Sequence, residues 1–343
     1  MEFLTILVII VVVVALLFDF VNGWNDSANA IATIVGTRVL SPFVAVIFAA
    51  VFNFVGALIG NQVANTMSKM IYVPRHPTPA EQEVVMIIVI TGLASAAAWK
   101  VFMTLLGLPI SGSHSLIGGV VGSAVAAAGV GILVGPNIGK TLLAMLLAPA
   151  LGFTVAYFLY VGLIRATAAW RPSTMNRTFG KLQIISAGCV AVTHGTNDAQ
   201  KVMGIITMAL VAGGFHEMGP GDKFVVPLWV QLACAVVISI GTATGGWKVI
   251  KTLGHSLTKL GPPEGCVAET GAAVVLASAA WLGIPISTTH TLTGAIMGLG
   301  ATRGWGAVRW GLGEKILLAW VFTLPITAAT GGTLFYFYSL FRQ

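Results

Sequence analysis

The stretch GLPISGSHSL at residues 107–116 is followed later in the chain by a near copy, GIPISTTHTL, at residues 283–292. A second motif is duplicated in the same order, because residues 22–28 read NGWNDSA and residues 194–200 read HGTNDAQ. The copies follow their originals after 176 and 172 residues, so the two spacings nearly agree. Two motifs repeated in one order at nearly one spacing indicate an internal duplication of the chain.

The amino-acid composition indicates whether this duplicated chain lies in water or in a membrane. Of its 343 residues, 57% are hydrophobic and only 8% are charged, whereas soluble domains carry about 25% charged residues. Apolar runs of about 20 residues recur, and this is the length with which an α-helix crosses ~30 Å of hydrocarbon. The net charge of +7 comes mainly from basic residues between these runs, so it does not indicate a nucleic-acid partner. We therefore predict an all-α integral membrane protein whose partner is the lipid bilayer.

The apolar runs fall into two sets of six, which predicts about 10–12 helical segments. The sets cover residues 3–21, 27–40, 42–66, 84–106, 115–134 and 141–164, and then residues 181–194, 198–213, 226–247, 266–282, 290–301 and 316–341. The stretch between the sets carries several basic residues and no acid. We expect a first transmembrane repeat at 1–165, a basic cytoplasmic linker at 166–181 and a second transmembrane repeat at 182–343.

Loop charges orient the two halves. With the linker in the cytoplasm, the acidic loop at 214–225 lies outside and the basic loop at 248–264 lies inside. This order requires residues 181–213 to cross once as a broken segment, and residues 266–301 to enter and leave on one side. The halves are then inverted repeats with interrupted helices and paired re-entrant-like hairpins, as in many secondary transporters, and both termini lie outside. Counting residues 3–40 as two crossings would instead give parallel repeats.

The duplicated Asn-Asp motifs place polar stripes on apolar helices, because positions i, i+3, i+4 and i+7 share one helix face. The stripes consist of Asn22, Asn25, Asp26 and Asn29 in the first copy, and of His194, Asn197, Asp198 and Lys201 in the second. An acid near the bilayer centre costs ~2.5–3.5 kcal/mol, so it needs a partner or a cation. Carboxylate and amide oxygens suit Na⁺, and a proton is the alternative. The sequence predicts Na⁺ ligands at Asp26, Asp198, Asn22 and Asn29.

Two other readings of these stripes stay open. The polar groups could satisfy one another at helix breaks without moving an ion. Lys201 lies one turn from Asp198, so it could neutralise that carboxylate or take part in transport as a proton carrier or supporting group.

The Pro-Ile-Ser motifs predict breaks within the membrane. Pro109 and Pro285 end a helix, because the residue before a proline avoids the α region. The following Ser and Thr residues would cap a new helix that starts near Ser115 or Thr291. Such a helix offers free backbone N–H groups and the positive end of its dipole, which together bind anions. Two copies facing each other would hold a small tetrahedral oxyanion, although plain capping of a kinked span is the simpler alternative.

The two motif types require each other. Asp26 and Asp198 would repel an oxyanion at close range unless cations lie between them. The sequence therefore predicts that cation and anion bind together, as they do in a symporter. His114 and His290 follow the hydroxyl clusters, where each could cap the helix, bind the anion or carry a proton.

Three charged residues stand outside the duplicated motifs. Lys100 and Glu269 lie in apolar runs without a counterpart in the other repeat, and we expect them to be interfacial or paired rather than part of the site. Asp19 precedes the first Asn-Asp motif and is a candidate gate or supporting group.

The motifs at 22–30 and 194–201, together with the two Pro-Ile-Ser segments, resemble the inorganic phosphate transporter family over essentially the whole chain. The resemblance implies inverted repeats, external termini and symport of phosphate with Na⁺ or H⁺. It also implies phosphate contacts at Ser111, Gly112, Ser113, Ser287, Thr288 and Thr289, and cation contacts at Asp26 and Asp198. Asn25 and Asn197 match the same motifs and would bridge the phosphate and cation sites. Unlike many relatives, the chain has only a short basic stretch between its halves, which indicates a compact prokaryotic form.

The predicted function is thus import of inorganic phosphate coupled to Na⁺ or H⁺ across the cell membrane, with no enzymatic activity and no cofactor besides the co-transported ion. A sulfate or other oxyanion permease and a passive anion channel are the alternatives, and the sequence leaves a homodimer open. An intramembrane hydrolase is disfavoured because the Gly-x-Ser-x-Gly elbow is missing.

Overall fold

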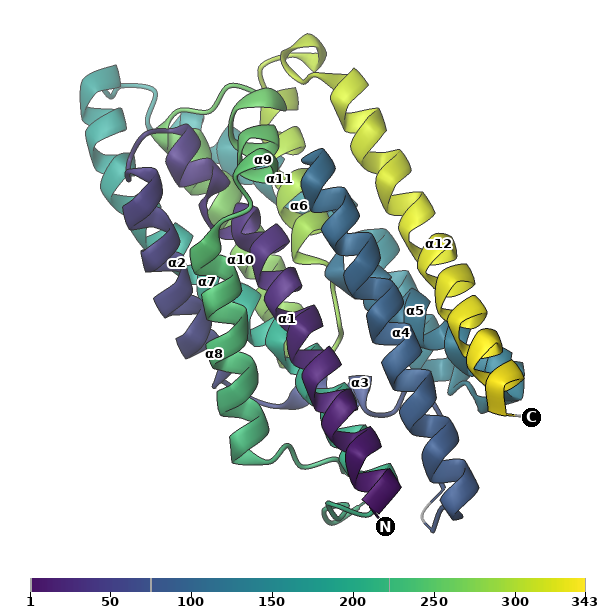
Figure 1. Cartoon of the computed structure of the whole chain (residues 1–343). Helices are drawn as coiled ribbons and strands as arrows, with labels where there is room; N and C mark the ends of the chain where they lie inside the picture. The colour runs from purple at the N-terminus through teal and green to yellow at the C-terminus, as the bar shows by residue number, and fades with distance from the viewer. Residues whose placement is uncertain (1, 75, 222, 343) are drawn as a thin grey trace.

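The structure is a computed structural model that describes residues 2–74, 76–221 and 223–342, and its named elements are all helical (Figure 1). The first half comprises α1 (Glu2–Gly36), α2 (Pro42–Ala57), α3 (Gln62–Met67), α4 (Pro79–Leu106), α5 (Gly112–Ala128) and α6 (Gly135–Ala166). The second half comprises α7 (Pro172–Ala212), α8 (Leu228–Thr244), α9 (Trp247–Lys251), α10 (Pro262–Trp281), α11 (Thr288–Ala301) and α12 (Trp310–Arg342). Three short turns, Val130–Ile132, Thr252–Ser256 and Trp305–Ala307, lie between helices.

The two halves are inverted repeats that exchange partners. Helix α1 runs away from the end of the bundle that holds both termini, and α7 runs towards it (Figure 1). Helix α1 packs on α8 of the other half, and its counterpart α7 packs on α2. In the same way α5 packs on α12, and α11 packs on α6. The predicted inverted architecture is therefore confirmed, and the halves are interleaved rather than separate.

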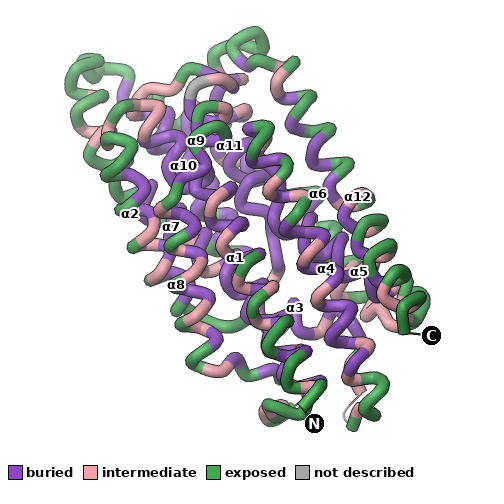
Figure 2. Tube along the Cα trace, viewed as in Figure 1, coloured by how far each residue is buried: buried purple, intermediate pink, exposed green. Residues whose placement is uncertain are grey.

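Several helices meet the requirements of a membrane span. Helices α1, α4, α6 and α12 are long and apolar enough to cross, and α8 with α9 forms a further candidate span that is bent by 63°. Large apolar side chains are exposed on the outside of the bundle, including Phe43, Leu146 and Phe341. The buried residues run along its middle (Figure 2). This distribution suits a bundle whose surface faces lipid tails and whose polar groups are satisfied inside.

The Asn-Asp motifs do not interrupt their helices, so this part of the prediction is wrong. Residues 22–29 lie inside the continuous α1 and residues 194–201 inside the continuous α7. A break was expected because each motif lies between two apolar runs, 3–21 and 27–40 in the first half and 181–194 and 198–213 in the second. Here Asn25 and Asn29 donate to side chains of other helices instead, at 2.6 Å to Thr104 and 2.9 Å to Thr289. The continuous α1 also decides against counting its residues as two crossings.

The connection between the halves is shorter than predicted. Only residues 167–171 lie outside the helices there, and residues 172–181 of the expected linker form the first turns of α7. Pro172 is the first residue of α7, where its fixed φ favours a helix start and its missing N–H costs nothing. The cytoplasmic placement of this connection stays a prediction.

The predicted re-entrant hairpins are present, and they start a few residues earlier than expected. Helix α4 ends at Leu106 and is followed by Gly107 with φ of 75°, and the chain turns at the corresponding Gly283 with φ of 66°. Only glycine adopts this left-handed backbone without strain. The new helices α5 and α11 begin at Gly112 and Thr288, after the prolines.

Close packing of α11 against α6 gives a test of the interleaved fold. A Cβ added at Gly294 would overlap the backbone carbonyl of Pro149 on α6, which has little room to move. We expect Gly294→Ala to lower stability by about 1–3 kcal/mol, seen as a lower thermal unfolding midpoint of the detergent-purified protein. Gly139→Ala is the control, because no atom of the described residues lies within 4 Å of its added Cβ. Equal midpoints for both variants would contradict the packing.

Candidate functional site

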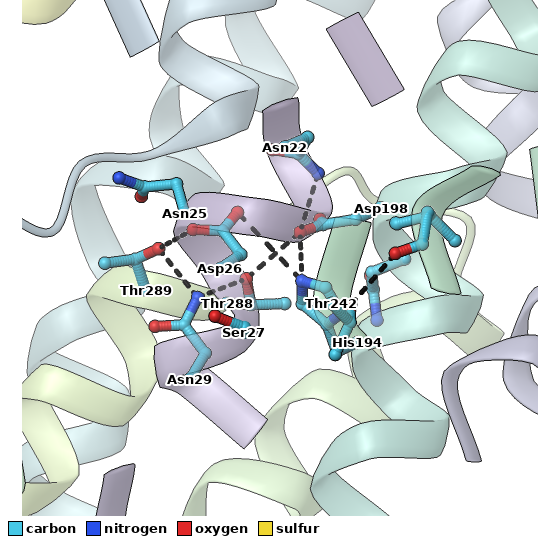
Figure 3. A network of polar contacts seen from close by, with 12 residues as sticks. Asn22, Asn25, Asp26, Ser27, Asn29, His194, Asp198, Thr242, Thr288 and Thr289 are labelled. Carbon is cyan, nitrogen blue, oxygen red and sulfur yellow. Dashed lines mark hydrogen bonds and ion pairs between the residues drawn. The ribbon is translucent and has the colours of Figure 1, made fainter. Parts of the chain in front are cut away.

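Two carboxylates, one from each repeat, are buried together where α1 and α7 pass each other. Asp26 on α1 and Asp198 on α7 are 1% and 3% exposed, and their carboxylates point toward each other (Figure 3). His194 joins them, with its Nε2 atom 3.0 Å from Asp198 Oδ2 and 4.0 Å from Asp26 Oδ2. One ligand atom from each of these three side chains lies within 4.8 Å of the others, so the group could hold a cation.

The N-termini of the two hairpin helices meet beside these carboxylates. Ser113 on α5 donates a hydrogen bond of 3.2 Å to the carbonyl of Ile286, just before α11. In the equivalent contact Thr289 on α11 donates over 3.3 Å to the carbonyl of Ile110, just before α5. The crossed pair follows the repeat symmetry and holds two positive helix ends together at a buried position. This is the arrangement that binds an anion between opposed N-termini.

Helix α11 connects the anion-binding region to both carboxylates. Thr289 Oγ1 lies 3.1 Å from Asp26 Oδ1, and Thr288 Oγ1 lies 3.2 Å from Asp198 Oδ2. Asn29 donates to both hydroxyl oxygens, at 2.9 Å to Thr289 and 3.3 Å to Thr288 (Figure 3). Binding of a cation at Asp26 or Asp198 would therefore act directly on the hydroxyls in the first turn of α11.

Lys100 is part of this network, contrary to the expectation that it lies outside the site. It is fully buried, and its ammonium lies 2.7 Å from Asp26 Oδ2 and also donates to the amide oxygen of Asn22. The residue was missed because the second repeat carries no lysine at the corresponding position. The sequence did carry a sign of this role, because Lys100 is a charged residue inside the apolar run 84–106. A charge buried in such a run must be paired.

Lys201 pairs with Asp198, which agrees with the neutralising role considered from the sequence. Its ammonium contacts Asp198 Oδ1 and donates over 2.8 Å to the carbonyl of Ile286. Asn22 also approaches Asp198, with its Nδ2 atom 3.5 Å from Oδ2. Asp26 and Asp198 are thus each paired with a lysine, Lys100 and Lys201.

The remaining predicted phosphate contacts are buried around the hairpins. Ser111 and Ser287 cap α5 and α11, because their hydroxyl oxygens accept from the backbone N–H of His114 and His290. Gly112 lies against Asn22 and Lys100, so a Cβ there would be 2.7 Å from Lys100 Nζ. Close approach of these groups to the start of α5 requires glycine at this position.

Asn25 and Asn197 are equivalent in the two repeats, and neither contacts the carboxylate of Asp26 or Asp198 among the described residues. Asn25 donates to Thr104 on α4, and Asn197 donates over 3.2 Å to the carbonyl of Leu276 on α10. The Oδ1 atoms of both are buried and have no hydrogen-bond partner among the described residues. These two acceptors are free for a ligand, but the bridging role expected for them stays a prediction.

The two histidines of the hairpins lie against each other across the repeat axis. The ring centres of His114 and His290 are 4.5 Å apart, and His290 stacks on Trp320 at 3.8 Å. Within the described chain, His114 Nδ1 and His290 Nε2 have no hydrogen-bond partner. The rings contribute packing beneath the hairpins, and a proton-carrying role for them stays a prediction.

The other two buried acids differ in how they are satisfied. Glu269 is paired, as expected, by Thr33 and Ser186 at 2.5 Å each and by Gln183 at 3.1 Å. Asp19 is fully buried, and the thiol of Cys234 beside it is a weak hydrogen-bond donor. Its role as a gate or supporting group stays a prediction.

Inverted repeats, a lipid-facing surface and a buried charged site at their junction define an integral membrane protein of the transporter class. Residues 22–176 and 162–331 each match the Phosphate transporter family. The chain therefore belongs to the phosphate transporter family, and phosphate transport, not enzymatic catalysis, is its activity.

Individual relatives agree with this assignment. The chain is 44% identical over 318 residues to a probable low-affinity inorganic phosphate transporter of Rhizobium meliloti, covering 92% of each chain. It is 40% identical over 336 residues to a transporter with the same description from Bacillus subtilis, covering 98% of each. A solved structure described as the sodium-dependent phosphate transporter has the same fold, with a TM-score of 0.86, 23% identity and coverage of 97% of this chain and 99% of that one.

The hydroxyl of Thr289 contacts both a carboxylate and the start of the other hairpin helix, so its removal tests the site directly. Thr289→Val keeps the side-chain volume but removes the hydroxyl that contacts Asp26, Asn29 and Ile110. We expect the KM for phosphate uptake to rise about tenfold, because one buried hydrogen-bonding group is worth 1–3 kcal/mol. Labelled-phosphate uptake into proteoliposomes measures this. Thr333→Val is the control, since that exposed hydroxyl donates to Ala329 of its own helix, and an unchanged KM in both variants would remove Thr289 from the site.

Proposed function

We propose that the chain is a secondary active symporter that imports inorganic phosphate together with a cation, Na⁺ or H⁺. Phosphate binds between the N-termini of α5 and α11, among Ser111, Gly112, Ser113, Ser287, Thr288 and Thr289, with Asn25 and Asn197 at its border. The cation acts at the carboxylates of Asp26 and Asp198, supported by Asn22 and Asn29. The observation that carries the proposal is the crossed contact of Ser113 and Thr289, which joins two helix N-termini beside two carboxylates.

Coupling follows from the charges at this junction. Phosphate placed at the start of α11 would lie next to Thr288 and Thr289, whose hydroxyls touch the two carboxylates. Like charges this close repel strongly in a buried site, so the anion needs positive charge near the carboxylates. A transporter that must place a cation there before the anion binds moves both in one cycle, which is symport.

Two cations are compatible with this site. Carboxylate and amide oxygens are ligands for Na⁺, and the solved structure with the same fold is described as sodium-dependent. His194 lies between the two carboxylates, and an imidazole is a group that can accept and release a proton. The uptake experiment below therefore tests both Na⁺ and H⁺ as the coupling cation.

The proposed orientation places both termini on the external side of the cell membrane. Both lie at one end of the bundle, and α9 with its Lys248 and Lys251 lies toward the other end (Figure 1). Basic loops favour the cytoplasmic side. Accessibility of single cysteines introduced near either end to an impermeant thiol reagent tests this orientation.

Uptake of labelled phosphate into proteoliposomes tests the function. We expect accumulation above equilibrium under a gradient of the coupling cation, with Na⁺ and proton gradients imposed separately to identify it, and competition by excess unlabelled phosphate but not by sulfate. Phosphate donates a hydrogen bond to an acceptor such as Asp, which sulfate at neutral pH cannot do. Preferred sulfate uptake would move the assignment to another oxyanion, and uptake that ignores both gradients would indicate a passive channel.

Removing either carboxylate should uncouple the transporter. We expect Asp26→Asn and Asp198→Asn each to reduce gradient-driven phosphate accumulation by at least about tenfold, because each removes a carboxylate at which the proposed cation acts and leaves a buried lysine without its charge partner. Glu314→Gln is the matched control, since Glu314 is an exposed carboxylate on α12. Full gradient-driven uptake by the Asp variants would exclude these residues from the coupling site.

A further inference from the structure

We propose that Lys100 and Lys201 are tethered cations that stand in the place of Na⁺ at the two carboxylates, so that phosphate transport by this chain does not require Na⁺. The inference rests on the proposed function, because it assumes that positive charge must accompany the anion at this site. It assigns to the lysines the choice of coupling ion.

Each ammonium has the surroundings of a bound hard cation. Lys100 Nζ contacts Asp26 Oδ2 at 2.7 Å and the amide oxygen of Asn22. Lys201 Nζ contacts Asp198 Oδ1 and the peptide oxygen of Ile286 at 2.8 Å. Both therefore sit among one carboxylate oxygen and one amide oxygen, the ligand types that Na⁺ takes. A Na⁺ ion cannot occupy these positions while the ammonium groups fill them.

The lysines do not come from the duplication. In the second repeat the position of Lys100 holds Leu276, and in the first repeat the position of Lys201 holds Asn29. The two carboxylates are duplicated, but their cations come from non-equivalent positions on α4 and α7. If the lysines served only for packing, there would be no reason for two non-equivalent positions each to place an ammonium at a carboxylate. A need for positive charge at each carboxylate explains it.

The tethered charges also lie where they attract the anion. A Cβ at Gly112, the first residue of α5, would lie 2.7 Å from Lys100 Nζ. Lys201 binds the carbonyl of Ile286, the residue before the cap of α11. Each hairpin helix therefore has a fixed positive charge at its N-terminus, which adds to the helix dipole without a bound ion.

The other charged groups of the region do not restore a sodium site. His194 lies between the two carboxylates and would share the site with any added cation. Asp19 has no ammonium, but it lies beside the Cys234 thiol, and sulfur is a poor ligand for a hard cation. The contacts of Glu269 are made to hydroxyl and amide groups on α1 and α7.

Binding of ²²Na⁺ to the purified full-length protein, and phosphate uptake with Na⁺ replaced by choline, test the inference. The variants are Lys100→Met and Lys201→Met, which keep the length of the side chain and remove the charge. Lys140→Met is the control, because Lys140 is exposed near the start of α6. For the wild type we expect no saturable ²²Na⁺ binding and less than about a twofold change in uptake without Na⁺.

In the site variants, the freed carboxylate should accept Na⁺. We expect ²²Na⁺ to bind at least about tenfold more tightly than in the wild type, and uptake to become dependent on Na⁺. Saturable Na⁺ binding by the wild type, or its uptake stopping in choline, would overturn the inference even if neither variant folds. Absence of phosphate uptake under every gradient would instead contradict the proposed symport, while the ²²Na⁺ binding would still decide the role of the lysines.

Discussion

The arrangement of this protein depends on two carboxylates that are buried in a membrane bundle and lie close to each other. An isolated charge in that position costs several kcal/mol, so each carboxylate must be surrounded by partners. Asp26 and Asp198 obtain them from four helices. Helix α4 supplies Lys100 and α11 supplies Thr288 and Thr289, while Asn22 on α1 and His194 and Lys201 on α7 complete the shell. The hairpins are held at mid-bundle by the same contacts.

The duplication made the fold predictable. Matching motifs at nearly equal spacing located both hairpins, and the prolines and serines within them placed the starts of α5 and α11 to within three residues. The carboxylates and hydroxyls brought together in the site were all members of the repeated motifs. Repetition works as evidence here because inverted repeats place equivalent residues on opposite sides of one axis.

Features without a repeat partner could not be found in this way. Lys100 was set aside because its counterpart is Leu276, yet its contact with Asp26 makes it part of the network. The expected breaks at the Asn-Asp motifs were also wrong, because partners on distant helices satisfy those side chains and leave the backbone ladder intact. Both errors concern contacts between residues far apart in the chain, which local pattern does not reveal.

The exchange of partners between the halves has a consequence for how the protein is made. Helix α5 packs on α12 and α6 packs on α11, so the first half leaves the ribosome with the faces of α5 and α6 uncovered. Those faces carry glycines such as Gly118 and Gly152, which fit against the backbone or side chains of helices not yet synthesised. These faces therefore stay uncovered until the second half is made, and the site, which takes residues from α11, cannot be complete before α11 is synthesised.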